Sequence, residues 1–192
     1  YTNFMQIVFV TSNLAKYNQA KLDCSQFGIK IVQDASHDFT EIQSESGEEI
    51  ARHKATAAFE LLQKPLVISD DSWNIPGLGG FPGAYMKSIN HWFTPEDWLR
   101  LTASLTERRI ILRQVVVYQD AVGQQVFIRE LPGVLMKEIR GKSPYPHSTI
   151  TSLDGGKTTT AMWHERGESA AQGLASPWHD FAAWYTKNHV KI

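Results

Sequence analysis

The stretch that decides the fold is Leu66-Val67-Ile68-Ser69-Asp70-Asp71-Ser72. Four residues suited to a buried strand run directly into two adjacent carboxylates. A short apolar run of this kind is typical of a strand in the interior of an α/β sheet. Adjacent like charges at a strand end are costly unless a positive group lies beside them. The stretch therefore predicts a core strand over 66–69 and a positive partner for Asp70 and Asp71.

The composition sets broad limits on the class of protein. With 192 residues, the chain is long enough for one domain with a proper core, and its composition is that of a soluble globular protein. Lys and Arg number 19 against 20 Asp and Glu, a net charge of −1. We therefore expect no nucleic-acid polymer as a partner, because no broad basic surface is available. A small anionic ligand needs only a local positive pocket.

The single cysteine and the hydropathy pattern bear on the compartment. Cys24 excludes an internal disulfide and gives no support for a thiolate zinc site, so we expect it to pack within a helix. No apolar run is long enough to span a bilayer, and no signal-peptide pattern is present. We therefore expect a cytoplasmic protein without membrane contact. Met5 is a candidate natural start, with residues 1–4 as a remnant before it, and the sequence leaves this open.

Strands and helices are predicted to alternate early in the chain, with a hairpin later. Helices are expected from Leu14 toward Gly28, from the capping box at Ser46 to about Gln63, from Thr94-Pro95 and from Ser176-Pro177. Strands are expected at 6–10, 29–32, 66–69, 110–118, 125–131 and 134–139, with a hairpin turn at 120–123 and a loop over 141–160, where one short strand is possible. This order predicts a single mixed α/β domain over residues 1–192, with a twisted sheet flanked by helices.

A candidate anion site lies where the first strand meets the first helix, at Thr11-Ser12-Asn13-Leu14-Ala15-Lys16. A helix N-terminus offers free N–H groups and a partial positive charge. Thr11 and Asn13 can add side-chain donors, and Lys16 can fold back toward the same anion. The alternative is that Asn13 only caps the helix while Lys16 is solvated.

A candidate metal site lies at Asp70-Asp71. Paired carboxylates suit a hard cation such as Mg²⁺, which takes oxygen ligands and keeps waters for substrate phosphates. Glu41 is a third candidate carboxylate, and Lys54 could balance the remaining charge. The alternative is that one aspartate caps a turn and the other is solvated. The glycine-rich segment 77–85 that follows indicates a loop with special backbone angles.

Two other signals are weaker. Gly156-Lys157-Thr158 resembles the end of a phosphate-binding P-loop, but the earlier glycine that this motif requires is Thr151 here. His147, His164 and His179 lack the spacing of a zinc site.

Taken together, these segments resemble the inosine triphosphate pyrophosphatase family, which hydrolyses non-standard purine nucleoside triphosphates. The family opens with T-G-N-x-x-K, which matches residues 11–16. Its carboxylate pair followed by L-G-G-x-P-G-x-Y matches Asp70-Asp71-Ser72 and residues 78–85. The segments 41–43 and 51–55 also match in order and at similar spacing. The resemblance is specific over roughly residues 6–90.

The resemblance implies a fold, a cofactor and residue roles. It implies an α/β domain with a cleft for phosphate and Mg²⁺ between Asn13 and Asp71, and commonly a homodimer. Mg²⁺ would be bound by Glu41 and Asp71, with Asp70 close by, and Asp71 would also orient or deprotonate the attacking water. The triphosphate would contact Thr11, Asn13, Lys16, Lys54, Ser72 and Lys87. Catalysis by charge neutralisation and positioning fits phosphate hydrolysis.

The second half departs from the family pattern. The base loop F-G-[WY]-D-P corresponds to residues 145–149, so Tyr145 and His147 would lie by the base and Ser148 replaces the aspartate. The motif S-H-R near the last helix fits Trp178-His179-Asp180 best. Asp accepts hydrogen bonds where Arg donates them, so Asp180 favours a base with an exocyclic amino group. The alternative is a misalignment in this loop-rich region.

Two functions follow from the sequence. The first is Mg²⁺-dependent hydrolysis of a nucleoside triphosphate to the monophosphate and pyrophosphate. The second is a nucleotide-binding regulatory protein that kept the phosphate residues and lost turnover. The full set of Lys16, Glu41, Lys54, Asp70 and Asp71 favours the enzyme, because a binding protein does not need the whole metal site.

Overall fold

A computed structural model describes residues 5–37, 39–171 and 173–189, which form two compact units. Unit 1 is built from residues up to 70, from 114–129 and from 175 onward, and unit 2 from 71–113 and 130–174. Three strands contribute residues to both units: β3 (Leu66–Asn74), β5 (Arg109–Gln119) and β6 (Gln124–Leu135). Residues 1–4, on which the question of a natural start at Met5 depends, lie outside the described residues.

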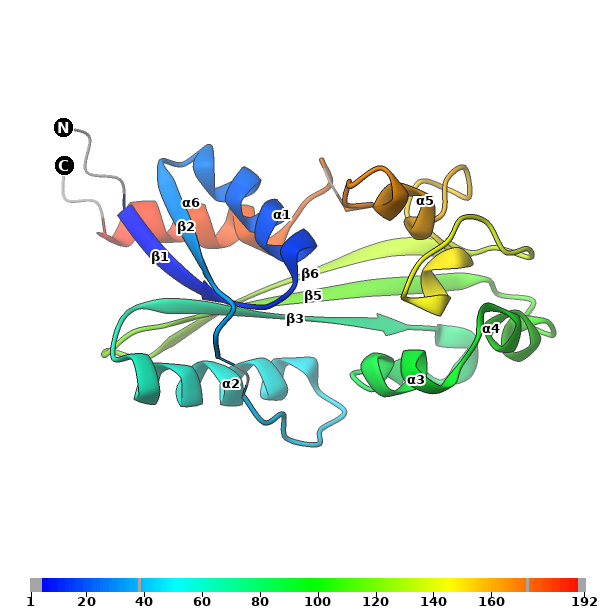
Figure 1. Ribbon diagram of the computed structural model, residues 1–192, viewed down its shortest axis with the longest axis horizontal. Helices are drawn as coiled ribbons and strands as arrows, with labels where there is room; N and C mark the ends of the chain where they lie inside the picture. Colours follow the sequence, from blue (N-terminus) through cyan, green and yellow to red (C-terminus); the bar gives the residue numbers. More distant parts are fainter. Residues whose placement is uncertain (1–4, 38, 172, 190–192) are drawn as a thin grey trace. The chain divides into compact units, whose positions relative to one another are not determined.

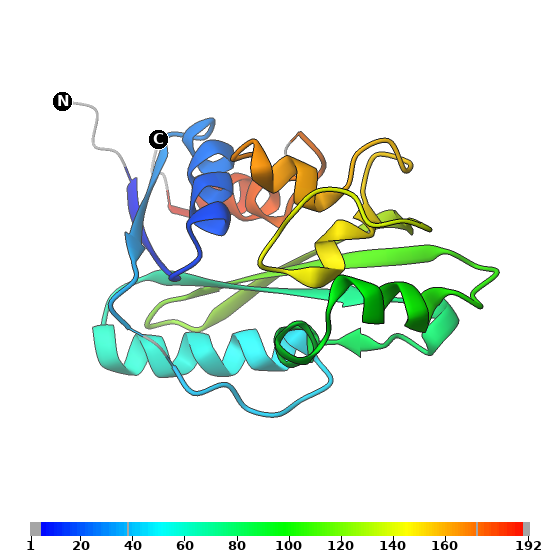
Figure 2. The same ribbon diagram turned by 45° about the vertical axis from the view of Figure 1, so that its right-hand side comes forward.

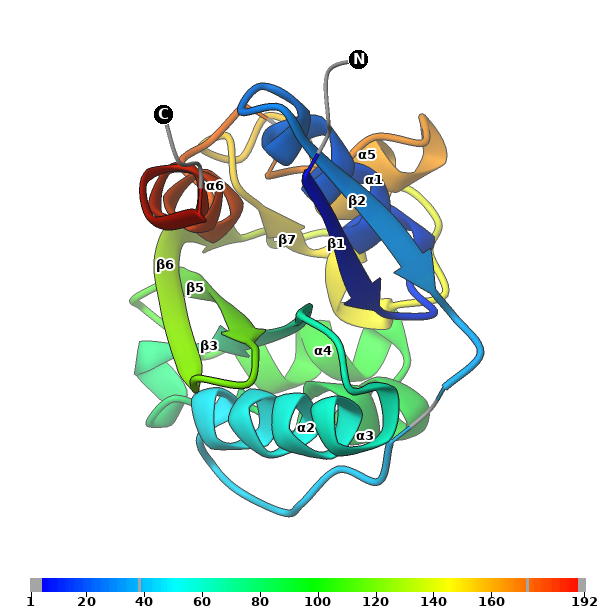
Figure 3. The same cartoon turned by 90° about the vertical axis from the view of Figure 1, so that its left-hand side faces the viewer.

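Unit 1 contains a sheet with the strand order β2-β1-β3-β5-β6. The strands β1 (Met5–Val10) and β2 (Ile29–Asp34) are parallel, and β1 is also parallel to β3, with Phe9 opposite Val67. One face is covered by α1 (Leu14–Ser25) and α6 (Pro177–His189), and the other by α2 (Gly47–Leu62) (Figures 1 and 3). The predicted α/β class, with a mixed sheet flanked by helices, is confirmed.

The apolar strands of unit 1 are buried on both faces because successive side chains alternate between them. Ile7 and Phe9 pack with Val67 in the cluster under α1 and α6. Their neighbours in sequence, such as Val8 and Ile68, pack instead with the alanines of α2. This two-sided burial explains why the strands appear in the sequence as continuous apolar runs.

Unit 2 has its own apolar core around Trp98, Ile75 and Ile110, none of which is exposed. Its additional strands are β4 (Pro82–Gly83), antiparallel to β3, and β7 (Thr151–Ser152), antiparallel to β6. Its helical segments are η1 (Pro76–Leu78), α3 (Met86–Trp92), α4 (Pro95–Thr102), η2 (Pro146–Thr149) and α5 (Thr160–Glu165). Figure 2 shows the η2 turn, in yellow, beside α4, in green.

Two predictions of local structure were wrong, and two short helices were missed. The strand predicted to end at Ser69 continues to Asn74, so Asp70 and Asp71 lie inside β3, where Trp73 and Asn74 pair with β4. The strands predicted at 125–131 and 134–139 form one strand that ends at Leu135. Two short helices, α3 and α5, were not predicted, because segments of seven and six residues carry little helical periodicity.

Other local predictions are confirmed. The hairpin turn closes with a hydrogen bond of 3.1 Å from Asp120 N–H to the Gly123 carbonyl. Cys24 is fully buried in α1, and burial raises the pKa of its thiol. The loop over 141–160 contains the short strand β7. Among the described residues, the helices are too short or too polar to cross a membrane.

Candidate functional site

The loop between β1 and α1 is held in shape by its own side chains. Asn13 Oδ1 accepts a hydrogen bond of 3.1 Å from Lys16 N–H, and Thr11 Oγ1 accepts one of 3.1 Å from Asn13 N–H. Thr11 N–H donates to the Asp34 carbonyl of β2 at 2.9 Å. The capping role of Asn13 is therefore confirmed. This role leaves other first-turn N–H groups without intrahelical partners, as at any helix N-terminus.

A lysine and a glutamate are paired on α2 and the segment before it. Lys54 lies on the same helix face as the buried Ala51 and Ala58. Its ammonium nitrogen is 2.8 Å from Glu41 Oε1, and the two side chains are 18% and 38% exposed. The predicted metal ligand and the predicted phosphate contact are thus held together, with their charges balanced.

The two aspartates of β3 point to opposite sides of the strand, because side chains alternate along it. Asp70 lies on the side of Ile68, which packs against α2. Asp71 lies on the other side. Ser72 is 5% exposed and its hydroxyl accepts a hydrogen bond of 3.5 Å from the Asn74 amide, so its side chain is largely enclosed.

The predicted base loop of unit 2 contains a buried histidine and an exposed tyrosine. His147 is 7% exposed, and its Nδ1 is 3.0 Å from Asn90 Oδ1 on α3. Burial, together with the nearby His164, lowers the pKa of His147 to about 3. Tyr145, at the start of η2, is 43% exposed. Lys87 is exposed on α3, where it is open to a ligand.

The residues at the start of α6 have different surroundings from those predicted. Trp178 is 3% exposed and its ring centroid lies 4.8 Å from that of Phe9, so it belongs to the core of unit 1. Both Asp180 carboxylate oxygens accept hydrogen bonds from Arg129, at 2.6 and 2.7 Å. The proposed contact of Asp180 with a base amino group would therefore require this pair to open. His179 is partly exposed, with Nδ1 3.8 Å from Asp23 Oδ2.

Several of these partners were not singled out in the sequence. Nothing in the sequence distinguishes Asn90 as a functional residue, because it is a polar residue in a short helix without clear periodicity. Asp23 is 6% exposed and accepts a hydrogen bond of 2.7 Å from the Ser176 hydroxyl. The signal available in the sequence was that Asp23 is adjacent to Cys24, a residue expected to be buried. Arg129 has the pattern of an ordinary solvated residue on a strand.

The predicted site residues divide between the two units. Unit 1 carries Thr11, Asn13, Lys16, Glu41, Lys54, Asp70, Trp178, His179 and Asp180, and unit 2 carries Asp71, Ser72, Lys87, Tyr145 and His147. The cleft between Asn13 and Asp71 stays a prediction. Within the described part of the chain, three or more His, Cys, Asp or Glu side chains do not gather as a protein-only metal cage would require. Mg²⁺ commonly takes only one or two carboxylates and completes its shell with waters and phosphates.

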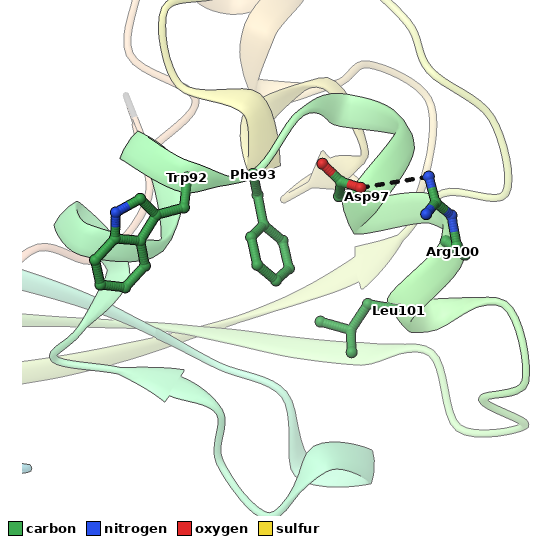
Figure 4. A pocket seen from close by; sticks show the side chains of 5 residues that line it. All are labelled: Trp92, Phe93, Asp97, Arg100 and Leu101. Atoms are coloured by element: carbon green, nitrogen blue, oxygen red, sulfur yellow. Dashed lines mark ion pairs between the residues drawn. The ribbon is translucent and has the colours of Figure 1, made fainter.

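A separate open hollow lies over α3 and α4 and is lined by Trp92, Phe93, Asp97, Arg100 and Leu101 (Figure 4). None of the predicted site residues lines it. Asp97 has a structural role there, because its carboxylate accepts a hydrogen bond of 2.9 Å from Thr94 N–H in the capping box of α4 and pairs with Arg100 at 3.3 Å.

Comparison with known proteins gives a consistent result. The model described as Ham1 family matches residues 7–170. A dITP/XTP pyrophosphatase from Methanopyrus kandleri is 30% identical over 96% of this chain and 98% of its own. An inosine triphosphate pyrophosphatase from Trypanosoma cruzi is 28% identical over 79% of this chain and 76% of its own. The HAM1 protein structure from Coxiella burnetii shares the fold, with a TM-score of 0.75, 17% identity and coverage of 95% and 99% of the two chains.

Proposed function

This chain belongs to the Ham1 family, and we propose from that premise that it hydrolyses nucleoside triphosphates to the monophosphate and pyrophosphate with the help of Mg²⁺. The predicted resemblance to the inosine triphosphate pyrophosphatase family is confirmed by the names of its relatives. The observation that carries the proposal is the family match itself. It includes the β1–α1 loop, the Glu41–Lys54 pair and the two aspartates of β3.

The residues present suit phosphate chemistry. Hydrolysis of a phosphoanhydride needs positioned charges more than covalent chemistry from the protein. Thr11, Asn13 and Lys16 at the start of α1 would hold phosphate oxygens, and Lys54 and Lys87 would add positive charge. Asp71 would orient the attacking water and accept its proton.

The carboxylates also fit a magnesium ion. Glu41 and Asp71 offer the oxygen ligands that Mg²⁺ prefers, and Mg²⁺ would neutralise the charge that develops on the phosphate oxygens. The Lys54 ammonium lies 2.8 Å from Glu41 Oε1 and balances its charge. When the substrate binds, this ammonium would contact a phosphate oxygen instead.

For the base, we propose deaminated purines, as in dITP and XTP. The relatives with these names support this choice. A base with an exocyclic amino group is the second candidate, suggested by Asp180. The pairing of both its oxygens with Arg129 counts against that role.

The test is pyrophosphate release from a panel of ordinary, deaminated and modified nucleoside triphosphates, with and without Mg²⁺. We expect metal-dependent release, fastest with inosine or xanthosine triphosphates, and a loss of at least about 100-fold in Asp71→Asn. Glu96→Gln, an exposed acid on α4, is the matched control and should retain full activity. Nucleotide binding without release from any triphosphate would favour the regulatory binder.

The homodimer implied by the resemblance is also part of the proposal. Sedimentation at several protein concentrations would test it, with twice the chain mass expected at micromolar concentration. A constant mass of one chain would contradict the dimer without bearing on the hydrolysis.

A further inference from the structure

The loop between β1 and α1 is held at its first residue by the end of the neighbouring strand β2 (Figure 3). Val10 and Asp34 form the last residue pair of the parallel β1–β2 ladder, and Thr11 follows directly. The Thr11 N–H donates to the Asp34 carbonyl at 2.9 Å, which continues the ladder by one bond. The Thr11 carbonyl accepts a hydrogen bond of 3.0 Å from the side-chain amide of Gln33. Both polar backbone groups of Thr11 are thus bound to β2.

The Gln33 side chain supplies a donor that the backbone of β2 does not. If the parallel ladder continued, the next donor to the Thr11 carbonyl would be the Ser36 N–H. That N–H is bound instead to Asp34 Oδ1 at 3.0 Å, and the same oxygen accepts a hydrogen bond of 2.7 Å from the Ser36 hydroxyl. The Gln33 amide therefore replaces a ladder bond at the point where the chain leaves β1 for the loop.

The position of Thr11 is passed on to the first turn of α1 by two further hydrogen bonds. Thr11 Oγ1 accepts from Asn13 N–H, and Asn13 Oδ1 accepts from Lys16 N–H, each at 3.1 Å. The N–H groups of Leu14 and Ala15 have no acceptor within the helix. With the partial positive charge of the helix N-terminus, they are the donors that this turn offers to an anion. A displacement of Thr11 would therefore move the cap and these donors together.

The bond from Gln33 is better suited to fixing a conformation than to stabilising the fold. Gln33 is partly exposed, so water can solvate its amide in the absence of the bond to Thr11. Holding a long side chain in one rotamer also costs conformational entropy. The net gain in stability from such a bond is small, and its main effect is to select one conformation of the loop.

We propose that Gln33 is a positioning residue that, through the Thr11 carbonyl, holds the β1–α1 loop in the conformation that receives the phosphates of the nucleotide. This inference rests on the proposed function, and it gives a part in phosphate binding to β2, an edge strand without a predicted site residue. Donors that are ordered in advance bind more tightly, because less entropy is lost on binding. Contacts that are equal in the bound substrate and in the transition state affect KM and not kcat.

The first test needs no activity. Amide hydrogen exchange, followed by NMR, compares the wild type with Gln33→Met, which keeps the length of the side chain and loses the donor. The N–H groups of Thr11, Asn13 and Lys16 are all hydrogen-bonded. They should exchange about fivefold faster in the variant, the value of one hydrogen bond. Equal exchange rates in the two proteins would overturn the inference, whatever the protein hydrolyses.

The matched control is Gln119→Met, the same substitution at the hairpin turn of unit 1. The Gln119 amide also donates to backbone carbonyls, those of Asp120 at 2.8 Å and Gly123 at 3.2 Å. This variant loses bonds of the same kind at a distant point in the sequence, and exchange over residues 11–16 should match the wild type. Equal acceleration in both variants would indicate a general loss of stability and would contradict a positioning role.

The second test measures phosphate binding directly. The probe is inorganic tripolyphosphate with Mg²⁺, which has neither base nor sugar, and binding is followed by calorimetry. Gln33→Met should bind it about fivefold more weakly than the wild type, and Gln119→Met equally well. In hydrolysis of inosine triphosphate, Gln33→Met should raise KM about fivefold and keep kcat within about twofold. A lower kcat with an unchanged KM would refute the proposed role.

The outcomes separate this inference from the proposed hydrolysis. Hydrolysis by the wild type, with unchanged KM and tripolyphosphate binding in Gln33→Met, would overturn the role of Gln33 and leave the proposed function intact. Binding of tripolyphosphate without hydrolysis of any nucleotide would refute the hydrolysis, and the dissociation constant of Gln33→Met would still decide the role of Gln33. A wild type that does not bind tripolyphosphate would contradict both the phosphate site and the inference.

Discussion

Asp70 and Asp71 are adjacent like charges in the sequence, and the geometry of the strand lowers the repulsion between them. They lie inside a continuous strand, so their side chains point to opposite sides and their carboxylates are held apart. Asp70 is on the side of the sheet covered by α2, the helix that carries Lys54. The repulsion expected from adjacent charges is therefore lowered by backbone geometry before any cation binds.

The Glu41–Lys54 pair should matter for activity and little for stability. In Lys54→Gln we expect kcat/KM to fall about 100-fold or more, because a positive group beside the phosphates is lost. The free energy of unfolding should change by less than about 1 kcal/mol, since the pair is partly exposed. Pyrophosphate release and urea unfolding measure the two effects.

The matched control for this substitution is Lys64→Gln, which changes an exposed lysine in the same way. It should behave as the wild type in both assays. Equal activities of the two variants would show that Lys54 has no part in the reaction.

Gly133 is required by packing. A Cβ at this position would lie 2.6 Å from the Ser152 carbonyl oxygen, closer than real Cβ atoms come, and 3.0 Å from the Leu153 side chain, which is a tight contact. Gly133→Ala should therefore destabilise the protein by about 1–3 kcal/mol in urea unfolding. Gly28→Ala is the comparison, because there the space is open and only the φ of +71° opposes a side chain, at a cost of about 1 kcal/mol. A neutral Gly133→Ala would show that β6 and β7 separate easily.

At the scale of elements, α1 and α6 are tied by a buried polar contact. Ser176 caps α6 by accepting a hydrogen bond of 3.1 Å from Trp178 N–H, and its hydroxyl donates to Asp23 of α1 at 2.7 Å. The contact joins residues that are far apart in sequence. It also satisfies a carboxylate that is only 6% exposed.

We expect Ser176→Ala to cost about 2 kcal/mol in the free energy of unfolding, because it removes the cap and leaves Asp23 without this donor. The double variant with Asp23→Ala should lose less than the sum of the two single losses, as coupled partners do. Ser104→Ala, an exposed serine beyond the end of α4, should have almost no effect. Additive losses in the cycle would rule out the coupling between the helices.

At the scale of the whole molecule, stability should depend on pH through His147. Its pKa is about 3 in the folded protein and about 6.5 when exposed. Between these values the unfolded chain binds a proton that the folded protein does not, so the stability falls as the pH falls below about 6.5, by up to about 1.4 kcal/mol per pH unit. The loss is complete near pH 3.

Urea unfolding from pH 7.5 to pH 4 tests this dependence. His147→Phe should lose less stability over that range than the wild type, whereas His91→Phe, at an exposed position, should follow the wild type. Parallel curves for the wild type and His147→Phe would mean that His147 is protonated readily in the folded protein.

The arrangement of two cores also belongs to this scale. Each unit has its own apolar cluster, one around Phe9 and Phe181 and one around Trp98 and Ile150. Asp70 is the last residue of the first segment of unit 1, and Asp71 is the first residue of unit 2. The adjacent carboxylates thus lie where the chain passes from unit 1 to unit 2, and the single domain over 1–192 stays a prediction.

The sequence by itself determined the alternation of strands and helices, the caps at Asn13, Ser46 and Thr94, and the family. These features are local, because a cap depends on residues three positions apart and a run of apolar residues by itself indicates a buried strand. The phosphate and metal candidates could be named for the same reason, since they lie in short motifs.

The tertiary structure alone decided which polar groups meet. The partners Asn90 of His147, Arg129 of Asp180 and Ser176 of Asp23 come from distant segments. It also extended β3 beyond Ser69, because pairing with β4 supplies hydrogen bonds that no local pattern specifies. Contacts between distant segments depend on how the chain packs, and packing is a property of the whole fold that no short stretch of sequence encodes.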